Sequence, residues 1–204
     1  MIVLRAKSVD YEVTYINLRE KPDWFLAISP HGKVPVLKVG EVPLFESNAI
    51  AEYLDEVVAP ALHPEDPLDR ARHRAWTDFV ADFAAMLGKI YYAKDETAMA
   101  AGIAAAKPKL ARLEQAVAAE RGDNGPYFSG ENLCLVDAAY APFFQRFAFC
   151  DTNLNTGLLD EFPRLRAWSD ALLATDMVTG AVAESFPAEY AANLQRRGTY
   201  VATL

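Results

Sequence analysis

The stretch from Lys21 to Glu56 decides the fold, and it reads KPDWFLAISPHGKVPVLKVGEVPLFESNAIAEYLDE. Proline is favoured at helix starts, Gly and Pro mark turns, and apolar spacing separates strands from helices. These rules predict, in chain order, a short helix opened by Pro22, a turn over 29–32, a strand over 34–39, a tight turn at 40–41, an antiparallel strand over 42–45 and a helix over 47–58. This order suits the binding of a small anionic peptide.

Five residues of this stretch have chemistry that fits such a ligand, and each has a plainer explanation. A cis bond between Val34 and Pro35 would turn the Val34 backbone groups toward a ligand backbone, whereas a trans proline would simply start an edge strand. Ser47 opens a helix whose free N–H groups attract a carboxylate, or it is only an N-cap. Glu46 can accept from an ammonium group, and the same serine N-cap is the plainer explanation of the Glu46-Ser47 pair. Lys21 is either a cation for a second carboxylate or a solvated surface lysine.

The residues before this stretch predict two further elements. Residues 2–7 are typical of the last turns of a helix. Tyr11, Val13 and Tyr15 alternate with polar residues, which predicts a strand over 10–18.

Prolines 60, 64 and 67 divide the chain into two unlike parts. Beyond them the apolar residues recur every three or four positions, which predicts helices only. We therefore expect an α/β domain over 1–59, a linker over 60–67 and an all-helical domain over 68–204. The predicted helices contain Trp76, Phe79, Phe83, Leu87 and Ile90; Leu110, Leu113 and Val117; residues 135–149; and Phe162, Leu165, Trp168 and Leu172. A loop is expected over 122–130, and residues from 185 onward show little periodicity.

Composition limits the function. With 52% hydrophobic residues among 204, a large core can form, and a net charge of −8 disfavours nucleic-acid binding. No run resembles a signal peptide or a membrane span, so we expect a cytoplasmic protein with no membrane partner. Cys134 and Cys150 match no metal or disulfide spacing and are predicted to be reduced and buried. His31, His63 and His73 are predicted to lie on the surface.

Three segments together resemble the glutathione transferase superfamily, and most closely its omega-like and stringent-starvation-protein-like branches. They are Lys21 to Phe25 against K-P-x-W-F, Ser29 to Leu37 against N/S-P-x-G-K-V-P-V-L, and Glu46 to Glu56 against E-S-x-A-I-x-E-Y-L-D-E. The resemblance extends to about Trp168. It implies a thioredoxin-like α/β N-terminal domain, an all-α helical-bundle C-terminal domain, glutathione as co-substrate, no metal, and a homodimer.

The resemblance also implies a role for each of the five residues. Lys21 would meet the glycine carboxylate of glutathione, Val34 would pair with the cysteinyl backbone, and Pro35 would be cis. Glu46 and Ser47 would hold the γ-glutamyl end. The implied activity is conjugation of glutathione to a small electrophile, or thiol transfer to a disulfide. The alternative is a non-catalytic interaction protein that resembles stringent starvation protein A, which contacts RNA polymerase.

A second substrate of such proteins lies between the domains, along the long helix after the linker. Tyr91 and Tyr92 are modest candidates for the wall of this site. Trp76 and Phe83 would face it only in one helix register, and such residues are more often core.

The catalytic residue remains unassigned. In the family it is a Cys, Ser or Tyr at the start of the first helix, where the helix dipole stabilises a thiolate. The sequence is expected to begin inside that helix, and Ser8 and Tyr11 come too late. We favour a misplaced start, with Met1 an internal methionine. The alternatives are a short protein whose sheet rearranges or borrows a partner's strand, and a strand over 10–18 that fills the gap.

The predicted buried helix starts with Cys134-Leu135-Val136-Asp137, where the family commonly has S/T-x-x-D. Asp137 can still accept from the backbone N–H of the capping residue, and we assign it a structural role, not a catalytic one.

Overall fold

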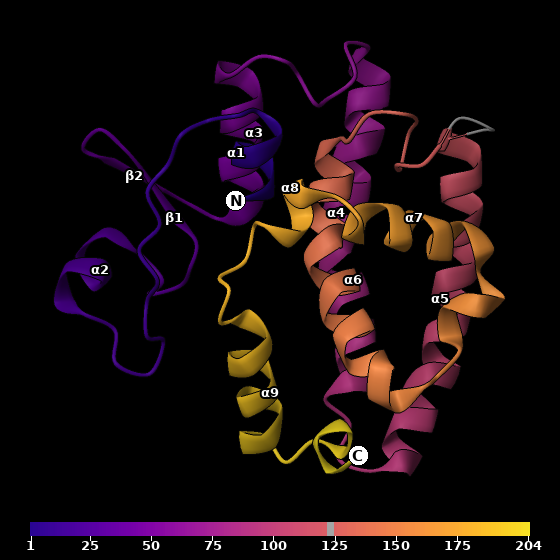
Figure 1. Cartoon of the computed structure of the whole chain (residues 1–204). Coiled ribbons are helices and arrows are strands. Elements are labelled where there is room, and N and C mark those ends of the chain that lie inside the picture. Colours follow the sequence, from indigo (N-terminus) through magenta and orange to yellow (C-terminus); the bar gives the residue numbers. More distant parts are fainter. Residues whose placement is uncertain (122–124) are drawn as a thin grey trace.

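The computed structural model describes residues 1–121 and 125–204, so the predicted loop over 122–130 lies partly outside the described residues. Figure 1 shows the small hairpin half beside the helical half. The elements are α1 (Ile2–Ala6), α2 (Asp23–Ile28), β1 (Val36–Val39), β2 (Val42–Phe45), α3 (Ser47–Val57), α4 (Pro67–Tyr91), α5 (Glu96–Arg121), α6 (Leu135–Leu154), η1 (Leu158–Glu161), α7 (Pro163–Leu173), α8 (Asp176–Thr179), α9 (Phe186–Arg196) and η2 (Tyr200–Thr203). The predicted fold class, an α/β half followed by an all-α half, is confirmed.

The hairpin between β1 and β2 is antiparallel, as predicted. Val36 lies opposite Phe45, and Val39 lies opposite Val42. Gly40 has φ +58° in the connecting turn, a conformation that residues with a Cβ rarely adopt.

The strand predicted over 10–18 is wrong. Residues 9–17 have no strand assignment, and the Val13 and Tyr15 side chains are 41% and 63% exposed. A strand exists only where its N–H and C=O groups pair with a neighbour. The sheet formed by the described residues contains only β1 and β2, so the alternation of side chains has no ladder to support it.

The helical half is built around α6, which packs against α4 and α7 while α4 also packs against α5 (Figure 1). Tyr140, Phe144 and Phe147 of α6 are fully buried or nearly so, which confirms the predicted central helix. Helix α9 was not predicted, because only Tyr190 and Leu194 of its residues are buried and two apolar positions make a weak period.

The two halves meet at the first turn of α6. Val3 and Leu4 of α1 and Ile50 and Leu54 of α3 form a second apolar cluster around Leu135. Burying these side chains against α6 fixes the small half on the helical half, and with it the hairpin that precedes α3.

A buried ion pair also ties α1 to α3 and to the linker. Lys7 Nζ lies 2.9 Å from Asp55 Oδ1, and the two side chains are 0% and 5% exposed. Lys7 also donates to the carbonyls of Val58 and Pro60, and the Asp55 carboxylate accepts from the backbone N–H of Leu62 at 2.6 Å. Each buried charge therefore has several hydrogen-bond partners, which is the condition for tolerating it.

Asp137 holds the start of α6, as predicted. Its Oδ2 accepts from the Cys134 N–H at 2.8 Å, and its Oδ1 accepts from the Phe128 N–H at 2.9 Å and the Trp168 indole N–H at 2.6 Å. Burial raises the pKa of this carboxyl, while the donors around it oppose that shift. One buried side chain thus joins α6, α7 and the loop before α6.

The prediction that all three histidines lie on the surface is wrong for two of them. His63 and His73 are 8% and 2% exposed, with ring centroids 6.1 Å apart, whereas His31 is exposed. His63 Nε2 lies 2.7 Å from a carboxylate oxygen of Glu52 in α3. The linker folds back to bring His63 onto α3 and α4, and no local sequence pattern records such a contact.

Burial lowers the pKa of His73, and the neighbouring His63 lowers it further. Acid is therefore expected to destabilise the protein. The unfolded chain takes up a proton near the ordinary pKa of about 6.5, whereas the folded protein does so only at lower pH. The free energy of unfolding should therefore fall as the pH drops from 7.5 to 5.5. Urea denaturation across this range should give a shallower slope for His73→Gln than for the wild type. The control His31→Gln should keep the wild-type slope, and equal slopes for all three proteins would contradict the prediction.

Candidate functional site

A small cavity of about 70 Å³ lies where the chain enters β1 and leaves β2. It is lined by Ser29, His31, Lys33, Val34, Pro35, Phe45, Glu46 and Ser47. Because Val36 pairs with Phe45, the residues just before β1 lie opposite those just after β2. The hairpin register therefore brings together four of the five residues proposed from the sequence. These four are two pairs, Val34-Pro35 and Glu46-Ser47, with ten residues of chain between them.

The segment before β1 is held by a tight turn. Ser29 Oγ donates to the Lys33 carbonyl and accepts from the Lys33 N–H, both at 2.9 Å. The peptide bond between Val34 and Pro35 is cis, as predicted.

The segment after β2 leads directly into α3, and the first backbone N–H groups of that helix have no side-chain cap within the described part of the chain. Glu46 is the N-cap of α3 and has φ +66°, which is uncommon for a residue with a side chain. No side chain of the described residues caps this helix. The first N–H groups of α3 beside Ser47 are therefore available to an anion, next to the Glu46 carboxylate, which can accept from an ammonium group. Backbone strain at such a position is common at ligand sites.

Lys21, the fifth residue proposed from the sequence, does not line the cavity. Its ammonium lies beside Gly32, 3.7 Å from the position that a Cβ would occupy there. The cation that does line the cavity is Lys33, which the sequence reasoning missed. Its place directly before Val34 in the Ser29–Leu37 motif was the available signal.

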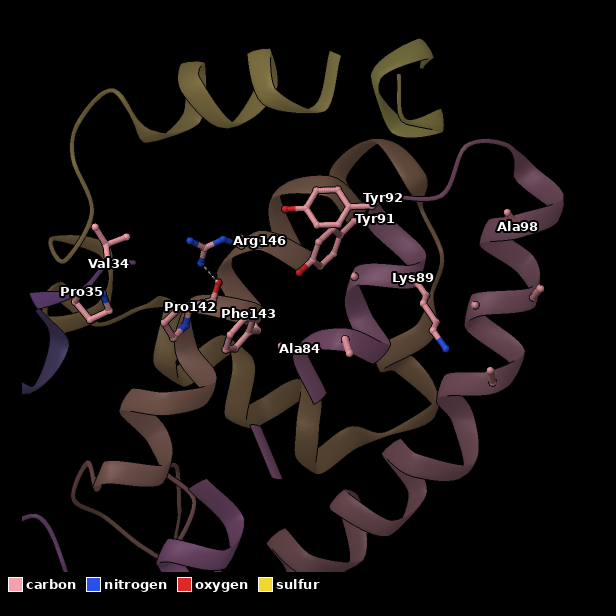
Figure 2. Close-up of a pocket in the computed structure, with 15 residues that line it drawn as sticks. Val34, Pro35, Ala84, Lys89, Tyr91, Tyr92, Ala98, Pro142, Phe143 and Arg146 are labelled. Carbon is pink, nitrogen blue, oxygen red and sulfur yellow. Dashed lines mark hydrogen bonds between the residues drawn. The ribbon is translucent and has the colours of Figure 1, made fainter. Parts of the chain in front are cut away.

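A larger pocket of about 1160 Å³ starts at the same dipeptide and extends between α4, α5 and α6 (Figure 2). Val34 and Pro35 line both cavities. The other lining residues are Ala84, Ala85, Gly88, Lys89, Tyr91 and Tyr92 of α4 and its end, Ala98, Ala101, Gly102 and Ala105 of α5, and Pro142, Phe143 and Arg146 of α6. The wall predicted from Tyr91 and Tyr92 is therefore present, whereas Trp76 and Phe83 do not line the pocket.

The cysteines are buried and reduced, as predicted. Burial raises the pKa of the Cys150 thiol to about 11 and that of the Cys134 thiol well above its usual value. Neither residue lines either cavity, so neither is placed to act as a nucleophile.

No group of His, Cys, Asp and Glu side chains in residues 1–121 and 125–204 could hold a metal ion. Within the same residues, every helix is too short or too polar to cross a membrane.

A hairpin entered through a cis-proline, followed by a helical half with a pocket between the two, is the architecture of the glutathione transferase fold. The family description "Glutathione S-transferase, N-terminal domain" matches residues 1–56, and "Glutathione S-transferase, C-terminal domain" matches residues 96–171. The chain belongs to the glutathione S-transferase family.

Relatives from two classes support this assignment. "Probable glutathione S-transferase GSTU6" of Oryza sativa subsp. japonica is 35% identical over 89% of this chain and 81% of its own length. "Glutathione S-transferase omega-1" of Rattus norvegicus is 30% identical over 82% of this chain and 68% of its own. The crystal structure of rice GST1 (OsGSTU1) in complex with glutathione has a TM-score of 0.76 and 27% identity, and covers 96% of this chain and 88% of that one.

Proposed function

We propose that the protein binds glutathione in the small cavity and presents its thiol to a second substrate in the larger pocket. The reaction would be conjugation to a small electrophile or thiol transfer to a disulfide. The observation that carries this proposal is the convergence of Val34, cis-Pro35, Glu46 and Ser47 on one cavity that shares a wall with a larger one. The solved rice relative in complex with glutathione supports it.

The lining of the small cavity supports a partner for the γ-glutamyl and cysteinyl parts of glutathione. The tripeptide has two carboxylates and one ammonium. The free N–H groups of α3 and the Ser47 hydroxyl suit the γ-glutamyl carboxylate, and Glu46 suits the ammonium. The Val34 backbone would pair with the cysteinyl residue, which places the thiol beside the larger pocket. The family resemblance assigns the glycine carboxylate to Lys21, which lies outside the cavity lining, whereas Lys33 is the lysine that lines the cavity.

Ser47→Ala is expected to weaken glutathione binding by roughly tenfold, because a hydroxyl donor to a carboxylate is lost. Calorimetric titration of the purified protein would measure this. Thr14→Ala is the matched control, since it removes an exposed hydroxyl outside both cavities and should leave the dissociation constant unchanged. Equal affinity of the wild type and Ser47→Ala, or no binding by the wild type, would overturn the proposal.

The second candidate function is that of a non-catalytic interaction protein that resembles stringent starvation protein A. One observation favours it over the thiol-transfer form of the reaction: the lining residues of both cavities, all of them described by the structure, include serines and tyrosines but no cysteine. Turnover of an electrophile or a disulfide at saturating glutathione would reject this candidate.

We propose the domain division 1–59, 60–67 and 68–204, a cytoplasmic location and a homodimer, all of which follow from the sequence or from family resemblance. Exposed apolar side chains of the small half, such as Val42 at 60% and Val57 at 56%, support an interface there. Sedimentation of the purified protein would test the dimer.

A further inference from the structure

The larger pocket has an unusual charge pattern for this protein. Its 15 lining residues include two charged side chains, Lys89 and Arg146, and both are cations. The whole sequence has a net charge of −8. Acidic residues thus outnumber basic ones over the chain, yet both of the charged residues that line this pocket are basic.

Arg146 is held in place without a carboxylate partner. Its Nη1 donates to the Pro142 carbonyl at 2.7 Å, and its guanidinium carbon lies 5.6 Å from the centre of the Phe186 ring of α9. None of the ion pairs formed by the described residues includes Arg146. A guanidinium carries five N–H donors in a fixed plane, so most of its donors are still available to a ligand.

The surroundings of Arg146 differ from those of Lys89. In Figure 2, Arg146 lies near Pro142 and the Tyr91–Tyr92 pair, whereas the Lys89 side chain extends toward α5. Phe143, Tyr91 and Tyr92 give this part of the pocket an aromatic wall, in which the two tyrosine rings meet edge to face at 4.6 Å. The neighbouring apolar wall and the free guanidinium donors together suit a ligand that has a flat body and a negative group.

We propose that Arg146 selects second substrates that join a ring-sized apolar body to an anionic group such as a carboxylate or sulfonate. This inference rests on the proposed function, since it takes the larger pocket as the second-substrate site. The apolar body packs on Phe143 and beside Tyr92, whose ring already has the Arg197 guanidinium carbon 4.7 Å from its centre, while the anion accepts hydrogen bonds from the free guanidinium donors of Arg146. Arg146 is a specificity-determining residue in this arrangement, and it takes no part in bond making.

Two fluorescent probes that differ by one charged group test the proposal without requiring turnover. The probe 8-anilino-1-naphthalenesulfonate carries a sulfonate, and N-phenyl-1-naphthylamine has the same rings without it. Titrated into the full-length protein at low salt, the sulfonate probe should bind roughly tenfold more tightly than the neutral one, as expected for charge-assisted hydrogen bonds. Equal affinities in the wild type would overturn the proposal.

Variants then assign the effect to one side chain. Arg146→Gln should weaken the sulfonate probe roughly tenfold and leave the neutral probe within about twofold. Arg146→Lys should restore part of the preference, because it returns the charge without the planar fork. Arg112→Gln is the matched control, because Arg112 is exposed on α5 and lines neither cavity, and it should leave both affinities within about twofold. A uniform loss for both probes would mean that Arg146 only shapes the pocket, and the proposal would fail.

Glutathione is itself an anion, so its binding to Arg146→Gln is the last measurement that tests the proposal. Its affinity for Arg146→Gln, measured by calorimetry, should equal that of the wild type. A loss matching that of the sulfonate probe would assign Arg146 to a glutathione carboxylate and overturn the proposal. Lack of glutathione binding by the wild type would reject the proposed function, whereas the probe preference reports on Arg146 separately.

Discussion

Asp137→Ala is expected to lower the free energy of unfolding by about 4 kcal/mol or more, a large part of the stability of a typical domain. The carboxylate accepts three N–H donors, from Phe128, Cys134 and Trp168, and each would be left buried without a partner. The change also leaves a void at the start of α6. Urea denaturation followed by circular dichroism would measure the loss.

Asp137→Asn separates hydrogen bonding from volume. Its amide oxygen can still accept from Phe128 and Trp168, but its NH₂ group would face the Cys134 N–H, where the carboxylate now accepts at 2.8 Å. We expect a loss smaller than that of alanine. Asp170→Ala, at an exposed position of α7, is the control and should cost less than about 0.5 kcal/mol. An effect of Asp137→Ala no larger than the control would refute the structural role.

Lys7→Met is expected to cost about 3–5 kcal/mol, because it leaves the buried Asp55 carboxylate without its cation. Methionine has a similar length, so the loss reports mainly on charge and hydrogen bonding. The same denaturation experiment applies. Lys38→Met is the matched control, since Lys38 pairs with Glu41 at the surface, with side chains 51% and 94% exposed. That variant should change the free energy of unfolding by less than about 1 kcal/mol.

A double variant tests whether the two charges act together. Asp55→Asn keeps an oxygen that can accept from the Leu62 N–H and removes the charge. Lys7→Met combined with Asp55→Asn should therefore cost less than the sum of the two single changes. Strict additivity would show that Lys7 and Asp55 stabilise the fold independently.

Local patterns were enough to predict much of the fold. The hairpin follows from two apolar runs around Gly40, and the long helices follow from apolar spacing, as at Phe83 and Leu87 in α4. The meeting of Val34 with Glu46 also follows from the sequence, because the hairpin register alone fixes which residues lie opposite each other.

Features that depend on contacts distant in sequence could not be predicted. The alternation at Tyr11, Val13 and Tyr15 favours an extended backbone, but a strand also needs a neighbouring strand to pair with. His63 is buried only because the linker returns to α3. Arg146 faces the larger pocket because of how α4, α5 and α6 pack, and its neighbours in sequence carry no sign of it.

The dipeptide Val34-Pro35 forms part of the wall of both cavities, and this has a thermodynamic consequence. Under the proposed function, glutathione in the small cavity and a second substrate in the larger pocket would both lie against this dipeptide. Linkage then requires that each ligand change the affinity of the other by the same factor. Under the proposed function, any effect that glutathione has on the affinity of the second substrate would thus be returned in equal measure by the second substrate on glutathione.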